Sequence, residues 1–147
     1  MEDRLVLTIQ RIADRLTDAD VTVATLAQML GNVEKTYTGS GYYLTPNEPG
    51  FKSVWVGISA AGKGQEEVTE VEVVLAAHAL LRLEELDGKF GEHKRVPPDP
   101  SGSLYVVRYF FDQTAKPYTA SIYATLNAAP DVGGAQAEQI TIRRDKR

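Results

Sequence analysis

The sequence contains no cysteine, which excludes disulfide bonds, thiol nucleophiles and thiolate metal ligands. Only two histidines are present, His78 and His93, and they lack the H-E-x-x-H spacing that places two metal ligands on one face of a helix. We therefore predict no metal site. No apolar run approaches the roughly 20 residues of a membrane-spanning helix, and the first residues lack the basic leader of a signal peptide. We expect no membrane partner and a cytoplasmic location.

Basic residues are outnumbered by acidic ones, 16 against 20, which gives a net charge of −4. Such a chain is a poor nucleic-acid binder, because Lys and Arg contacts to phosphate supply most of that affinity. The one dense basic run is RRDKR over residues 143–147, which we expect to be a solvated, fraying terminus. An acidic chain favours a basic protein partner through electrostatic attraction.

The segment GISAAGKG, residues 57–64, is one residue short of the phosphate-binding loop G-x-x-x-x-G-K-[ST]. Gly64 stands where the loop needs a hydroxyl to hold the metal ion. The residues that follow, GQEEVTEVEVVL, alternate with a period of two, so no helix begins there to receive a phosphate. We therefore expect residues 60–65 to form a hairpin turn, and we predict no nucleotide or other cofactor.

The first 32 residues show helical periodicity. Residues 3–17 carry an apolar stripe formed by Leu5, Ile9, Ile12 and Leu16. A second helix is expected to begin after a cap at Asp20 or Thr22 and to end at Gly31, which can adopt a left-handed conformation. These two segments predict a helical hairpin over 1–32 whose apolar side packs on a sheet.

The rest of the chain is mainly β. Alternating or β-branched segments predict strands at 52–59, 69–75, 104–112, 118–127 and 139–143. We expect 104–112 and 118–127 to pair as an antiparallel hairpin and 139–143 to add an edge strand. Residues 76–87 fit a helix that stops at Gly88, or a strand paired with KFGEHKRV. The prediction is one α+β domain over 1–147, with the hairpin packed on an antiparallel sheet of about five strands within 42–147.

The segment LDGKFGEHKRV, residues 86–96, resembles the D-G-K hairpin of cone-shaped, cystatin-like α+β domains that follow an N-terminal helical pair. The two β segments after it depart from that plan. An α+β domain of this cystatin-like kind would suit an alternative function, which is binding or hydrolysis of a small ligand in a cavity between helices and sheet. His78 or His93 would act there with a carboxylate, for example His93 with Glu92 or Asp112.

No catalytic motif is present, since none of the serines lies in a G-x-S-x-G turn. Aromatic residues and one arginine instead gather in the predicted strands. Because Tyr, Trp and Arg dominate interface energetics, we predict a binding surface formed by Tyr43, Trp55, Arg108, Phe110 and Tyr123. The leading hypothesis is a non-catalytic protein-interaction module of the inhibitor, immunity, chaperone or phage accessory type. A third hypothesis is a homo-oligomeric structural component joined through a β edge or the sheet face.

Overall fold

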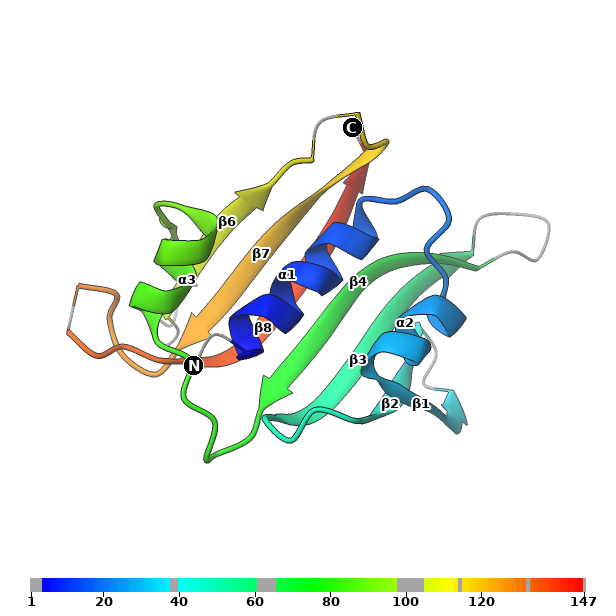
Figure 1. Cartoon of the computed structure of the whole chain (residues 1–147), viewed down its shortest axis with the longest axis horizontal. Coiled ribbons are helices and arrows are strands. Elements are labelled where there is room, and N and C mark those ends of the chain that lie inside the picture. The colour runs from blue at the N-terminus through cyan, green and yellow to red at the C-terminus, as the bar shows by residue number, and fades with distance from the viewer. Residues whose placement is uncertain are drawn as a thin grey trace.

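The computed structural model is α+β, and its described residues form three helices and one antiparallel sheet of eight strands (Figure 1). The described residues are 4–37, 40–60, 66–97, 105–113, 115–131 and 133–146. The helices are α1 (Arg4–Leu16), α2 (Val23–Leu30) and α3 (Leu83–Phe90). The strands are β1 (Gly31–Tyr37), β2 (Gly41–Pro46), β3 (Phe51–Ala60), β4 (Glu66–Leu75), β5 (Lys94–Val96), β6 (Tyr105–Phe111), β7 (Tyr118–Leu126) and β8 (Ala137–Lys146). No helix of these ranges is long and apolar enough to cross a membrane.

The strand order across the sheet is β1-β2-β3-β4-β8-β7-β6-β5. The β3–β4 and β6–β7 hairpins pair antiparallel, and the second of these confirms the expected pairing of 104–112 with 118–127. The number of strands was underestimated, since β1, β2 and β5 add to the five predicted. The predicted edge position of 139–143 is wrong. This segment belongs to β8, which lies between β4 and β7 and joins two antiparallel halves of the sheet.

All three helices cover the same face of the sheet (Figure 1). The first, α1, packs against β7, β8 and β4, whereas α2 packs against β1 and β2, and α3 contacts β6 and α1. The expected hairpin is therefore corrected to one helix over the central strands and one over the β1 edge of the sheet, because each apolar stripe faces its own strands. Fully buried residues of α1 and of the central strands form one core: Ile9, Ile12, Leu16, Val71, Val73, Ile122, Ile140 and Ile142.

The second helix begins and ends as the sequence predicts. The Thr22 hydroxyl accepts a hydrogen bond from the Thr25 backbone N–H at 3.1 Å, which is one of the two expected caps. The helix ends at Gly31, where β1 starts directly with a φ of +148°. A Cβ at Gly31 would lie 1.8 Å from the Thr45 carbonyl oxygen. Only glycine permits this close approach of β1 to β2.

The helix expected near 76–87 begins later in the chain, at Leu83, and Gly88 lies inside it. The backbone before it is engaged elsewhere. The Ala137 N–H donates to the Leu81 carbonyl at 2.8 Å, and the Leu83 N–H donates to the Ala135 carbonyl at 3.0 Å. These bonds to the segment leading into β8 hold residues 81–83 extended. The helix stops at Gly91, whose φ is +94°.

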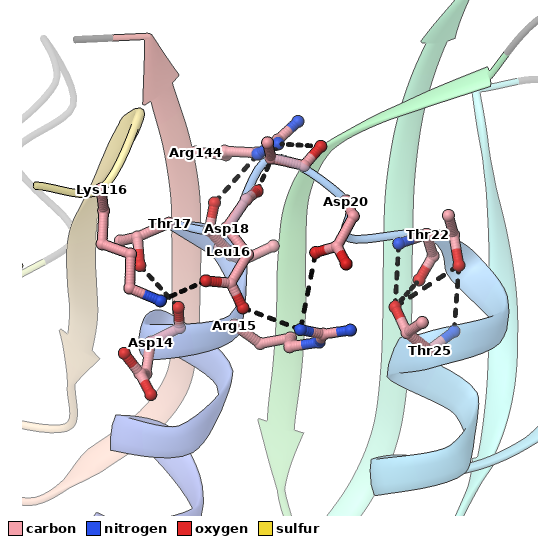
Figure 2. Close-up of polar contacts among 11 residues, drawn as sticks. Asp14, Arg15, Leu16, Thr17, Asp18, Asp20, Thr22, Thr25, Lys116 and Arg144 are labelled. Atoms are coloured by element: carbon pink, nitrogen blue, oxygen red, sulfur yellow. Dashed lines mark hydrogen bonds and ion pairs between the residues drawn. The ribbon is translucent and has the colours of Figure 1, made fainter.

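Residues 143–146 of the basic run do not fray as expected, because β8 continues to Lys146. The Arg144 side chain is only 3% exposed. Its guanidinium donates to the backbone carbonyls of Leu16, the last residue of α1, at 2.9 Å and of Asp18 at 2.6 Å (Figure 2). It also lies 3.5 Å from the centre of the Tyr118 ring. Arg144 therefore ties the end of α1 to the sheet and satisfies carbonyls that the helix leaves unpaired.

The side chain of Asp18 lies at the centre of the polar cluster beside Arg144 (Figure 2). It accepts from Arg15 at 2.7 Å and from the Lys116 ammonium. The hydrogen bond from Lys116 is the largest cause that lowers the pKa of Asp18. The loop that leaves α1 is thus fixed by charged side chains from two parts of the chain.

The phosphate-loop resemblance does not extend into a helix. Ala60 of β3 pairs with Glu66 of β4, and β4 is a strand from that residue onward. This confirms that no helix follows the glycine-rich segment. The predicted turn at 60–65 lies outside the described residues beyond Ala60.

Candidate functional site

A row of side chains crosses the face of the sheet that the helices leave open. Residues opposite each other on paired strands point to the same side of a sheet. The register links, one strand at a time, Tyr43, Trp55, Glu72, Thr141, Tyr123, Arg108 and Lys94. Phe110 lies two residues beyond Arg108 on β6 and points the same way. All five predicted binding residues therefore lie on one face, although the pattern on single strands could not place them together.

The five residues form two groups on this open face. Tyr43 and Trp55 lie on the neighbouring strands β2 and β3, whereas Tyr123, Arg108 and Phe110 lie on β7 and β6. The two central strands β4 and β8 separate the groups. Tyr43 is 40% exposed and Phe110 is 58% exposed, and the other three are half-buried. Their role in binding stays a prediction.

The Trp55 ring lies against the backbone of two strands. A Cβ at Gly41 would come within 2.6 Å of the ring, and one at Gly57 within 3.0 Å. Gly41 and Gly57 are partners in the β2–β3 register. The ring thus fills the space that the two glycines leave on the sheet, which fixes its orientation and accounts for part of its burial.

Two arginines flank the Tyr123 ring, at 6.0 Å for Arg108 and 5.4 Å for Arg143. Arg108 donates to the Ser121 hydroxyl at 3.2 Å, and Ser121 donates in turn to Asp145 at 2.9 Å. Asp145 also accepts from Arg143 at 2.8 Å, and this bond is the main reason that the pKa of Arg143 is raised. The Arg108 Nε atom is buried and has no hydrogen-bond partner in the described part of the chain. The Asp145 carboxylate thus binds Arg143 directly and is linked to Arg108 through the Ser121 hydroxyl.

Two carboxylates, Glu70 and Glu72, lie on β4 on the same open face. Burial is the largest cause that raises the pKa of Glu70, and repulsion from Glu72 adds to it, while Arg143 acts in the opposite direction. Negative charge therefore lies on the β4 side of the face. Positive charge lies on the β6 and β5 side, at Arg108 and Lys94.

A second cluster, which the sequence did not predict, lies beside α3. The His93 Nδ1 atom is 2.9 Å from Asp87, and the buried Tyr109 hydroxyl donates to the same carboxylate at 2.6 Å. Burial and the Asp87 carboxylate raise the pKa of Tyr109. His93 and Asp87 line a cavity of about 180 Å³ together with Glu84 and Asp131. When Nδ1 donates to this carboxylate, the lone pair of a neutral imidazole is carried by Nε2.

The expected partners of His93 were Glu92 or Asp112, and the structure instead pairs it with Asp87. His93 follows Asp87 by six positions, and the end of α3 at Gly91 turns the chain back between them. No periodicity in the sequence signals this pairing. His78 is exposed in the segment before α3. In the ranges that the structure describes, no group of three or more His, Asp or Glu side chains is arranged to hold a metal ion.

Comparison with models of protein families, with characterised proteins and with solved structures gave no match to this chain.

Proposed function

We propose that this protein is a non-catalytic protein-interaction module that binds its partner through the helix-free face of the sheet. One observation supports the proposal above all: Tyr43, Trp55, Tyr123, Arg108 and Phe110 share this face through the strand register. Aromatic and arginine side chains supply most of the binding energy of protein interfaces. The sheet holds them on rigid strands, so little conformational entropy is lost when a partner covers them.

The net charge of −4 favours a basic partner, since long-range attraction raises the rate of association. On the face itself, the carboxylates of β4 and the cations of β6 and β5 fix the orientation in which a partner can dock. The proposed location is cytoplasmic, and an inhibitor, immunity, chaperone or phage accessory protein is the type of module that fits this size and chemistry.

The test compares two exposed apolar residues of nearly equal exposure. Phe110, on the face, is 58% exposed, and Leu80, in the segment before α3, is 56% exposed. Tagged wild-type protein, Phe110→Ala and Leu80→Ala are used to capture proteins from an extract of the native host. We expect Phe110→Ala to raise the dissociation constant for a specific partner by about 30-fold, as loss of an interface hot spot does. Retention of that partner by Phe110→Ala, with loss in Leu80→Ala, would contradict the proposal.

A second candidate function is the binding or hydrolysis of a small ligand in the cavity beside His93. The observation that favours it is the pairing of His93 with Asp87 at the cavity wall, which suits the imidazole to act as a general base. A metabolite that raises the melting temperature of the wild type, but not of His93→Ala, would support this candidate. If no metabolite has this effect and His93→Ala captures the same partner as the wild type, the second candidate is rejected and the first proposal is kept.

A further inference from the structure

The open face has its centre on β8. In the row that crosses the face, Thr141 of β8 has three side chains on either side. Glu72 and Tyr123 lie one strand away from it in opposite directions, and Trp55 and Arg108 lie two strands away. The strands on the two sides of β8 therefore correspond in three pairs at equal distances: β4 with β7, β3 with β6, and β2 with β5.

The residues at equal distances from β8 are chemically complementary. Trp55 corresponds to Arg108, and Tyr43 corresponds to Lys94, which are aromatic–cation pairs. Glu72 corresponds to Tyr123, whose hydroxyl can donate to a carboxylate. A two-fold rotation about an axis along β8 brings each residue opposite its counterpart in a second copy, as an isologous interface requires.

We infer that the partner of the helix-free face is a second copy of this chain, packed face to face about a two-fold axis along β8. The inference rests on the proposed function for the location of the binding face, and it names a second copy, whose net charge is also −4, in place of a basic partner. Two sheets packed in this way lie about 10 Å apart with their strands within about 30° of each other. Glu72 then lies over Tyr123 of the second copy. Measured along the sheet, it is offset from Arg108 of that copy by one strand spacing of about 4.8 Å.

The neighbouring row obeys the same symmetry. It runs through Gly57, Glu70, Arg143, Ser121 and Phe110. The rotation brings the exposed Phe110 ring over Gly57 of the second copy, where the Trp55 ring of that copy covers the sheet, so that the two aromatic rings meet. Glu70 lies over Ser121, which is fully buried and donates its hydroxyl to Asp145 of its own copy, so this pair adds no hydrogen bond. Arg143 lies on the axis, and its charge is already compensated within each copy by Asp145 at 2.8 Å.

The size of the face suits a stable dimer. Six strand spacings make the row about 29 Å long. With the rows through Phe110 and Val106 on either side, the face covers about 600 Å² in projection. Each partner in a standard interface buries about 800 Å² of accessible surface, which includes the relief of the side chains. A second copy therefore covers an area of the size that specific dimers bury.

The inference is tested by light scattering on the purified full chain and on charge variants. We expect the wild type to be a dimer at micromolar concentration. Glu72→Arg and Arg108→Glu each place two like-charged pairs across the interface, and each is expected to raise the dissociation constant at least about 100-fold. An equimolar mixture of the two variants is expected to form a dimer again, because each copy then supplies the charge that the other lacks. Glu92→Arg, on an exposed residue after α3, is the control and stays dimeric.

A wild type that remains monomeric, or a mixture that fails to dimerise while circular dichroism shows both variants folded, overturns the inference. If a variant does not fold, Thr141→Arg replaces it, since it sets two like charges on the axis, and a dimer of this variant also overturns the inference. The proposed function is judged separately. A monomeric wild type that loses a captured partner on Phe110→Ala leaves protein binding intact and removes only the second copy as occupant.

Discussion

Replacement of Arg144 by alanine is expected to destabilise the protein strongly. The side chain is 3% exposed and donates to the carbonyls of Leu16 and Asp18 at 2.9 and 2.6 Å. Hydrogen bonds from a charged donor contribute about 1.5–3 kcal/mol each, and stacking of the guanidinium on Tyr118 adds to them. After the cost of desolvating the guanidinium is offset, we expect a loss of about 4 kcal/mol in the free energy of unfolding.

The loss is measured by urea unfolding followed through Trp55 fluorescence. With a slope of about 2 kcal/mol per molar urea, the midpoint is expected to fall by about 2 M at unchanged slope. Lys146→Ala is the control, because Lys146 is an exposed residue two positions further along the same strand. It is expected to change stability by less than about 0.5 kcal/mol. If both variants behaved alike, the tail would be frayed and Arg144 would not anchor α1.

Three further predictions concern glycines and carboxylates. Gly31→Ala is expected to cost at least about 3 kcal/mol, because its Cβ would collide with the Thr45 carbonyl, whereas Gly88→Ala is expected to stabilise α3 by about 0.5–1 kcal/mol, since nothing lies within 4 Å of its Cβ. Thermal unfolding of the two variants at pH 7 measures both effects, and equal melting temperatures would refute the reasoning. The pKa of Asp18 is lowered mainly by the hydrogen bond from Lys116, so its contribution is present above its unfolded pKa of about 4 and lost as the pH falls through the lower folded pKa. Wild type is therefore expected to lose more stability than Asp18→Asn between pH 5 and pH 2, in a melting-temperature series; parallel curves for the two proteins would contradict this. The pKa of Glu70 is raised, mainly by burial, so its ionised form destabilises the fold at neutral pH. Glu70→Gln is expected to unfold at a higher temperature than wild type at pH 7, and this gain should vanish below the unfolded pKa of about 4; a gain that persisted there would have another origin.

The sequence predicted the features that depend on local periodicity. The apolar stripe of α1 and the strand at 118–127 follow from spacings of 3.6 and 2 residues, and the structure has the buried stripe and the strand β7. The start of α2 follows from the short-range cap at Thr22. Such signals lie within a few residues of each other, so one sequence suffices to detect them.

Features that depend on distant segments were not predictable. The start of α3 is set by hydrogen bonds between Leu81 and Ala137 and between Leu83 and Ala135, which join segments more than 50 residues apart in the chain. The central position of β8 follows from pairing with both β4 and β7 rather than from its own alternation. For the candidate site, residue types pointed to an aromatic and arginine surface, but the register that aligns Trp55 with Arg108 arises only in the assembled sheet. The pairing of His93 with Asp87 is missed for the same reason.

The position of β8 also constrains the order of folding. Until residues 137–146 have been synthesised, β4 and β7 each have an unpaired edge, and the first and second halves of the sheet share no hydrogen-bonded neighbour. A nascent chain in this state has two unpaired strand edges that can pair with other chains and cause aggregation. Pairing of β8 with β4 joins residues more than 60 positions apart, so we expect this non-local step to be slow compared with formation of the β7–β8 hairpin. The nascent polypeptide therefore has most need of a holding chaperone immediately before this strand emerges.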